Sequence, residues 1–228
     1  MPNRKARARK EPTNYSNNKM LNRYIPKTTN QIEYIRAICE NQITFCTGVS
    51  GSGKTALAFC LACEHLLEGK TERIILTKPY VETGKGLGAL PGELELKIAP
   101  YLATFHDYLD YFLGLEQKKK FLSEGKIKIL AMEYCRGITF RGSYIIADEM
   151  QNASWEQIKM LLTRIDDYSK IIINGDYRQT DLNGRGKSGL EPIIEKLQGV
   201  NGIGFINMEK CDILRAGIIK DILGRLEE

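Results

Sequence analysis

Residues 48–55 have the types and spacing needed to bind phosphate groups. The stretch consists of Gly48, Val49, Ser50, Gly51, Ser52, Gly53, Lys54 and Thr55. Glycines let the backbone turn sharply, so that successive N–H groups point inward as hydrogen-bond donors to an anion. In this pattern Lys54 can reach the β- and γ-phosphates of a nucleotide, and the hydroxyl of Thr55 can ligate Mg²⁺. We therefore predict a site for a nucleoside triphosphate.

The segments on either side of this stretch support the prediction. Residues 42–47 form an apolar run typical of a buried strand, and residues 56–62 are typical of a helix packed on a sheet. A strand, a glycine-rich loop and a helix in this order make a phosphate-binding P-loop, and the positive end of the helix dipole adds to the binding. The alternative is a glycine-rich turn that matches the pattern by chance.

Two carboxylates, Asp148 and Glu149, end a second apolar run at residues 143–149. Ligand sites in α/β sheets gather at the carboxyl ends of strands, so we expect both acids near the P-loop. Mg²⁺ prefers carboxylates and water, which assigns the metal to Asp148. Glu149 is then placed to polarise the water that attacks the γ-phosphate, which favours ATP hydrolysis over transfer to a small molecule. The alternative is an exposed acidic turn.

Four further residues are candidates for the same site. Gln179 follows the predicted strand at 170–176 and is the candidate sensor of the γ-phosphate. The amide of Gln31 could pair with the N6 and N7 edge of adenine. Arg164 and Arg215 lie near predicted turns, and either guanidinium could stabilise the transferred phosphate. The ordinary alternatives are a polar turn for Gln179, a first-turn helix residue for Gln31, and a surface position for each arginine.

The basic charge of the chain is concentrated at its N-terminus. The 228 residues carry a formal net charge of +5, and residues 1–23 alone contain seven Lys or Arg and one acidic residue. We expect this segment to be a disordered tail. It either binds the phosphates of RNA or DNA or only aids solubility. Residues 24–228 are expected to form one domain.

The composition indicates a protein of the cytoplasm. No run approaches the roughly 18 apolar residues that a membrane helix needs, and the basic N-terminus has no apolar segment of a secretory signal. Four of the six cysteines lie in apolar runs, so buried thiols are expected rather than disulfides. We therefore expect no membrane partner.

Strands and helices alternate along residues 24–228, which predicts an α/β fold. The strands are continuously apolar, as in a mostly parallel sheet that helices cover on both faces. The first helix is expected to begin with Asn30 as its cap and Glu33 three residues later. The predicted strands span residues 42–47, 73–79, 127–131, 143–149, 170–176 and 203–208. The predicted helices cover residues 28–38, 56–62, 93–124, 155–164, 188–197 and 213–226.

With these motifs in place, the chain resembles the PhoH family of P-loop ATPases in its short, single-core form. The resemblance runs from about residue 27 to the C-terminus. It is carried by Thr29-Asn30-Gln31, the P-loop, Thr77-Lys78-Pro79, Leu87-Gly88, Asp148-Glu149-Met150-Gln151-Asn152, Gly175-Asp176, Gln179-Thr180-Asp181-Leu182 and Asp212-Ile213-Leu214-Arg215. The family is similar to the first ATPase core of superfamily 1 helicases, which implies a RecA-type core and a link to RNA.

The resemblance also implies roles for individual residues. It assigns ATP binding to Gln31, Lys54, Thr55, Asp148, Glu149 and Gln179, and suggests that Arg215 reaches the phosphates. It places Thr77, Lys78 and the loop at residues 84–92, which contains Lys85, toward nucleic acid.

The sequence therefore predicts a Mg²⁺-dependent ATPase coupled to RNA or single-stranded nucleic acid, similar to an RNA helicase. The alternatives are an ATP-driven protein switch or chaperone-like ATPase that uses no nucleic acid, and a small-molecule kinase. Helicases with two cores close ATP between them, whereas this chain holds one core. We therefore expect a homo-oligomeric ring, with six subunits, in which a neighbour completes each site.

Overall fold

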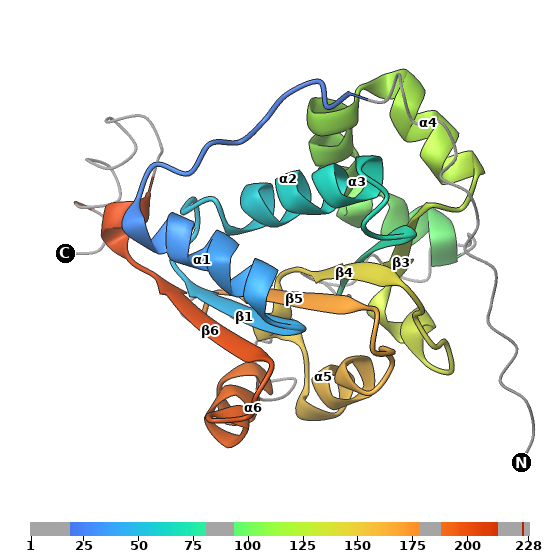
Figure 1. Cartoon of the computed structure of the whole chain (residues 1–228). Coiled ribbons are helices and arrows are strands. Elements are labelled where there is room, and N and C mark those ends of the chain that lie inside the picture. The colour runs from blue at the N-terminus through green and yellow to red at the C-terminus, as the bar shows by residue number, and fades with distance from the viewer. Residues whose placement is uncertain (1–18, 81–93, 178–187, 214–224, 226–228) are drawn as a thin grey trace, which may run out of the picture.

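The computed structural model describes residues 19–80, 94–177, 188–213 and 225, and in this part of the chain six strands form one sheet (Figure 1). Neighbouring strands pair in parallel throughout, in the order β3-β2-β4-β5-β1-β6. The strands are β1 (Ile43–Gly48), β2 (Arg73–Lys78), β3 (Ile127–Ala131), β4 (Ser143–Ala147), β5 (Lys170–Gly175) and β6 (Ile203–Met208). The prediction of a parallel α/β sheet is confirmed.

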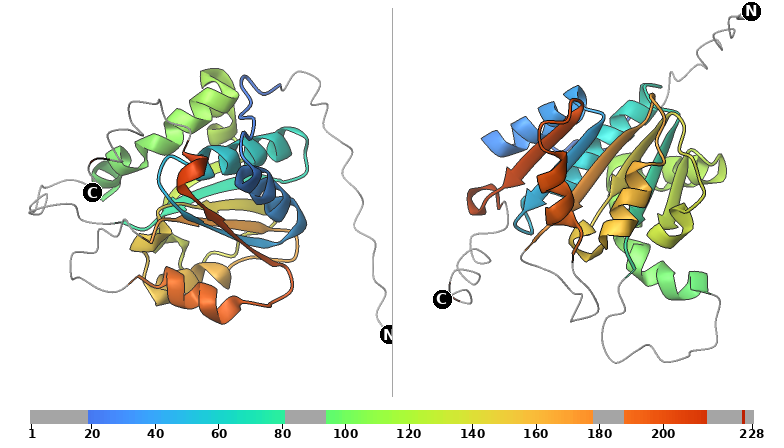
Figure 2. Two further views of the ribbon diagram at one scale, coloured as in Figure 1. Left: turned by 90° about the vertical axis from the view of Figure 1, so that its left-hand side faces the viewer. Right: turned by 90° about the horizontal axis from the view of Figure 1, so that it is seen from below.

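Helices cover both faces of the sheet, as expected (Figure 1). One face carries α1 (Thr29–Glu40), α2 (Lys54–Leu67), α3 (Leu94–Leu113) and α4 (Leu115–Ser123). The other face carries α5 (Trp155–Leu162) and α6 (Leu190–Leu197), which Figure 2 shows below the sheet in its left-hand view. Short 3₁₀ helices are η1 (Met132–Cys135), η2 (Met150–Asn152) and η3 (Lys210–Asp212). None of the described helices is both long and apolar enough to cross a bilayer.

The apolar character of the strands follows from burial on two sides. Successive strand residues point to opposite faces, so Ile146 and Ile172 join the core under α1–α4, whereas Ile145 and Ile173 join the core over α5 and α6. Each of these four side chains is almost completely buried. A strand buried in this way gains burial energy at every position, which explains why its sequence is continuously apolar rather than alternating.

The strand order brings the predicted chemical groups to one edge. Strand β5 lies between β1 and β4, so the loop after β1, the acids after β4 and the turn after β5 leave the sheet side by side. Strands are about 4.8 Å apart, which puts the ends of β1 and β4 at about 10 Å. That separation suits a phosphate group and a metal ion held between the P-loop and a carboxylate.

The N-cap of the first helix lies two residues before the predicted one. Its N-cap is Thr28, whose hydroxyl accepts a hydrogen bond from the backbone N–H of Gln31 at 3.3 Å, so the prediction of Asn30 as cap is wrong. Asn30 instead donates from its side chain to Asp212 at 2.8 Å. The partner of Asn30 is 182 residues away in sequence, and local capping rules therefore could not identify it.

The N-terminal segment predicted as a tail is partly described. Residues 1–18 lie outside the described residues, but residues 19–23 contact two helices. The N–H of Leu21 donates to the Phe112 carbonyl at 2.8 Å, and Arg23 forms an ion pair with Glu64 at 2.6 Å. Contacts with α3 and α2 therefore begin before residue 24. The predicted closing helix at 213–226 lies almost entirely outside the described residues.

Candidate nucleotide-binding site

The loop between β1 and α2 has the backbone that a P-loop requires. Gly48 has a φ of 113°, and a Cβ there would lie 1.9 Å from the Met208 carbonyl oxygen, so a side chain cannot fit. Gly53 also has a left-handed φ of 88° and is the N-cap of α2. The chain thus enters α2 with the free N–H groups of the helix facing the pocket, where an anion is stabilised.

Lys54 is held over this loop. Its ammonium group donates to the carbonyls of Gly48 at 2.7 Å and Val49 at 2.8 Å, and the residue is 9 % exposed. The hydroxyl of Ser52 donates to the same Val49 carbonyl at 2.8 Å. These bonds keep a buried positive charge at the mouth of the loop.

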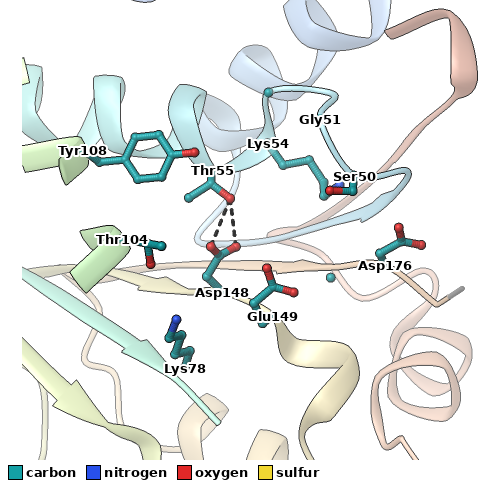
Figure 3. Close-up of a pocket in the computed structure, with 12 residues that line it drawn as sticks. Ser50, Gly51, Lys54, Thr55, Lys78, Thr104, Tyr108, Asp148, Glu149 and Asp176 are labelled. Atoms are coloured by element: carbon teal, nitrogen blue, oxygen red, sulfur yellow. Dashed lines mark hydrogen bonds between the residues drawn. The ribbon is translucent and has the colours of Figure 1, made fainter. Parts of the chain in front are cut away.

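The hydroxyl of Thr55 and the carboxylate of Asp148 meet across the pocket (Figure 3). Thr55 Oγ1 lies 3.0 Å from each carboxylate oxygen and donates to the group. Burial and the neighbouring charge of Glu149 raise the pKa of Asp148 to about 6, although the Thr55 hydroxyl and Lys54 oppose the shift. The charged form of Asp148 therefore carries an electrostatic penalty that a bound cation would relieve.

Glu149 and the end of β5 complete the floor of the pocket. Glu149 lies next to Asp148 with its carboxylate toward the P-loop side, and Gly175 and Asp176 line the same cavity (Figure 3). The cavity volume is about 270 Å³. Complete small-molecule sites commonly occupy about 300–1,000 Å³, so the described cavity suits a triphosphate and its metal ion better than a whole nucleotide.

Helix α3 and strand β2 supply lining residues that were not predicted for this pocket. They are Thr104 and Tyr108 of α3 and Lys78 at the end of β2. No sequence motif marks the two α3 residues, since their place depends on how α3 packs against α2. The sequence does give a signal for Lys78 as a pocket residue, because it ends an apolar strand beside the strand that leads to Asp148.

Thr77 and Lys78 are buried, whereas the resemblance to the PhoH family placed both toward nucleic acid. Thr77 is completely buried, and its hydroxyl accepts a hydrogen bond from the Cys135 thiol at 3.7 Å. Lys78 is 7 % exposed, and its ammonium lies 5.5 Å from the centre of the Phe105 ring. Burial lowers the pKa of Lys78, while the carboxylates of Asp148 and Glu149 act against that shift. The structure thus places Lys78 among the phosphate-site residues instead of on an outer surface.

The side chain of Gln31 is hydrogen-bonded to the backbone of the P-loop. The side chain is completely buried, its Nε2 donates to the Ser52 carbonyl at 2.8 Å, and its Oε1 accepts from the Lys27 N–H at 2.7 Å. Each end of the amide therefore has one backbone partner, and the predicted pairing of Gln31 with adenine stays a prediction.

The start of α1 is hydrogen-bonded to η3, the short helix that follows β6. The carboxylate of Asp212 accepts hydrogen bonds from the side chains of Thr28 and Asn30 and from the Glu209 N–H. Burial raises the pKa of Asp212, but these hydrogen bonds outweigh it and lower the pKa overall. The segment that carries Gln31 is thereby fixed against η3, behind the P-loop.

Of the remaining predicted residues, Arg164 alone is among those that the structure describes. Gln179, Arg215 and Lys85 lie outside the described residues. Arg164 is described, but its carbonyl accepts from the Phe140 N–H at 2.7 Å near the start of β4. That position is at the amino ends of the strands, whereas the P-loop follows the carboxyl end of β1. Arg164 therefore does not reach the pocket of its own chain.

The comparisons with known proteins agree with this geometry. The family model described as "PhoH-like protein" matches residues 24–227. The PhoH-like protein of Synechocystis sp. is 40 % identical over 201 residues, which cover 88 % of this chain and 61 % of that protein. The PhoH-like protein of Bacillus subtilis is 41 % identical over 197 residues, covering 86 % of this chain and 62 % of that protein. The chain thus spans less than two thirds of these relatives.

A solved structure supports the fold independently of close sequence similarity. The large terminase from a thermophilic bacteriophage superposes with a TM-score of 0.52 at 13 % identity, over 90 % of this chain and 51 % of that one. At this identity the match concerns the fold, a RecA-like P-loop core. With the family model matching nearly the whole described region, the chain belongs to the PhoH-like protein family.

Proposed function

We propose that this protein is a Mg²⁺-dependent ATPase whose hydrolysis is coupled to single-stranded nucleic acid. The observation that carries the proposal is the pairing of Thr55 with Asp148, 3.0 Å apart, in the pocket that also contains Lys54 and Glu149. A hydroxyl, a carboxylate, an ammonium group and a second carboxylate are the side chains that phosphoryl transfer to water requires.

The phosphate end of the nucleotide would be bound by backbone and by Lys54. The N-terminus of α2 supplies N–H donors and the positive end of its dipole. Lys54 already lies at the loop, so it needs only to exchange two carbonyl acceptors for phosphate oxygens. Lys78 adds a second positive charge on the far side of Asp148 (Figure 3), where it would offset the charge of the phosphates.

The residues present fit a Mg²⁺ ion. The ion prefers oxygen ligands and keeps several waters and phosphate oxygens in its shell, so one carboxylate and one hydroxyl suffice. Asp148 and Thr55 supply them, and the raised pKa of Asp148 is what a carboxylate without a compensating cation would have. When bound, the ion would neutralise negative charge on the phosphates.

Glu149 is the group that would accept a proton from the attacking water. Its carboxylate lies in the pocket beside Asp148, and its backbone has a left-handed φ of 55°, which among the described non-glycine residues occurs only here. Such conformations are unfavourable for residues with a Cβ and cluster at functional sites. A strained backbone at Glu149 is expected where the direction of its side chain matters for function.

The coupling to nucleic acid rests on the charge of the chain. Seven Lys or Arg residues accompany a single acidic residue in residues 1–23, and such a segment can replace the counterions of a polynucleotide. Thr77, Lys78 and Lys85 were the residues first expected to face nucleic acid, and Thr77 and Lys78 are buried. The proposal therefore places the contact on the basic N-terminal segment.

The proposed assembly is a ring, with six subunits expected. Among the described lining residues of the pocket, the positive charges come from two lysines, Lys54 and Lys78, and none from an arginine. A guanidinium that stabilises the transferred phosphate is worth about 10³-fold or more in related reactions. A neighbouring subunit could supply it, or Arg215 from the same chain.

Glu149→Gln should separate binding from hydrolysis. The amide cannot accept the proton from water, so the hydrolysis rate should fall by about 10²- to 10⁴-fold, while ATP affinity stays near that of the wild type. Lys54→Ala should lose affinity instead. The exposed residue Glu116 on α4 provides the matched control, Glu116→Gln, with unchanged turnover. Full activity of Glu149→Gln would exclude Glu149 as the base.

The same inactive variant tests the ring. When Glu149→Gln subunits are mixed with wild-type subunits at constant total protein, shared sites should make the activity fall faster or slower than the wild-type fraction. Turnover measured across the mixing ratio gives the curve. A strictly proportional fall would contradict sites completed by a neighbour.

Asp148 should make metal-free stability depend on pH. Its folded pKa of about 6 lies above the unperturbed value of 3.8, so as pH rises the unfolded chain ionises first and stability falls between about pH 4 and 6. The free energy of unfolding in EDTA, compared with that of Asp148→Asn, should show the wild type losing its relative stability across this range. A difference that does not change with pH would contradict the assignment.

Charge removal in the N-terminal segment should weaken binding to single-stranded RNA or DNA. Neutralising two contacts lowers the slope of log affinity against log salt by up to about 1.4, since each phosphate contact contributes about 0.7. Arg4→Gln/Lys5→Gln should show this loss and a weaker stimulation of ATP hydrolysis. The control removes two exposed lysines of α4, as Lys119→Gln/Lys120→Gln. Equal slopes in all three proteins, or no binding at all, would argue against the coupling.

A further inference from the structure

We infer that Gln151 is the positioning residue for Glu149, and that it fixes the Glu149 carboxylate relative to the end of β5. The inference rests on the proposed function, since it concerns the group that would activate water. Gln151 belongs to η2, two residues after Glu149, and its side chain points into the protein with 1 % of the residue exposed.

The amide of Gln151 bridges two functional segments. Its Nε2 donates to Glu149 Oε2 at 2.7 Å, and its Oε1 accepts from the backbone N–H of Asp176 at 3.0 Å. A carboxylate can only accept and a backbone N–H can only donate, so one orientation of the amide satisfies both partners. The geometry therefore selects glutamine, because a side chain with acceptors alone or with no polar atoms cannot make both bonds.

The absence of a side chain at Gly175 makes room for this bridge. A Cβ at Gly175 would lie 3.2 Å from Gln151 Oε1 and 3.1 Å from the Gln151 backbone nitrogen. It would also lie 2.4 Å from Cδ2 of Leu190 on α6. Only a glycine at the end of β5 thus lets Gln151 and Leu190 pack directly against the strand.

The segment that carries Gln151 is held from its other side as well. The N–H of Gly189 donates to the Ala153 carbonyl at 2.8 Å. A Cβ at Gly189 would lie 2.1 Å from the backbone nitrogen of Trp155, so α6 meets the start of α5 backbone to backbone. Gln151 therefore sits in a rigid frame that joins η2, β5 and α6.

This frame explains how Glu149 can hold a defined position. Glu149 is exposed and has an unfavourable backbone conformation, with a φ of 55°, and an unsupported exposed glutamate would sample several rotamers. A charge-assisted hydrogen bond from a buried, fully packed donor restricts it to one. The consequence is a carboxylate whose place is set by β5 as well as by β4.

Two substitutions separate this role from general stability. Gln151→Met keeps the length and volume of the side chain but loses both hydrogen bonds. Gln151→Glu keeps an acceptor for the Asp176 N–H and loses the donor to Glu149. Both should lower kcat for ATP hydrolysis by about 10- to 100-fold, as loss of a supporting hydrogen bond does in comparable sites, with KM and nucleotide affinity close to wild type.

The control is Gln157, which caps α5 through the Ser154 N–H and contacts Glu133 outside the pocket. Gln157→Met should lower the melting temperature and leave kcat unchanged at temperatures where the protein is folded. If Gln151→Met and Gln151→Glu, checked for folding by the same melting curve, also retain the wild-type kcat, the inference is overturned.

A double variant tests whether Gln151 acts through Glu149. In a Glu149→Gln background, Gln151→Met should cause little further loss in single-turnover hydrolysis, because the group that it positions has already been removed. A further loss as large as in the wild-type background overturns the inference. A wild-type protein that binds ATP but does not hydrolyse it would instead overturn the proposed function, so the two failures are distinguishable.

Discussion

The hydrogen bonds between Thr55 and Asp148 join segments that are 93 residues apart in sequence, and the rest of the site is arranged around this contact. It exists because β1 and β4 run in parallel with β5 between them, so that their carboxyl ends meet. The same burial that makes the contact also raises the pKa of Asp148. The fold therefore holds a carboxylate whose charged form is disfavoured, and a bound cation would offset that penalty.

The parts of the site that follow from local rules were predictable from sequence. Gly48 and Gly53 occupy positions that need positive φ, Lys54 and Thr55 begin a helix, and Asp148 follows a strand buried on both faces. Continuous apolar strands indicated a covered parallel sheet, and parallel strands place their ends together. Ser154 caps α5 with a complete capping box. In each case a chemical requirement acts within a few residues of the chain.

The parts that depend on tertiary packing were not predictable. Thr77 and Lys78 are the last two residues of β2, yet Thr77 is buried against Cys135 and Lys78 lines the pocket. Asn30 bonds to Asp212, which is distant in sequence, and the cap of α1 is Thr28. The side chain of Gln31 is hydrogen-bonded to the backbone at Ser52 and Lys27. The residue type alone does not distinguish such a structural role from a contact with adenine. Thr104 and Tyr108 enter the pocket only because α3 packs on α2.

We propose that this pocket binds the triphosphate of ATP with Mg²⁺. The most direct measurement is a crystal structure of the protein with Mg²⁺ and a non-hydrolysable ATP analogue. We expect phosphates at the N-terminus of α2, Lys54 moved from the Gly48 and Val49 carbonyls to phosphate oxygens, and the metal ion between Thr55 and Asp148. An analogue bound elsewhere, or a Lys54 that keeps its carbonyl partners beside bound phosphates, would contradict it.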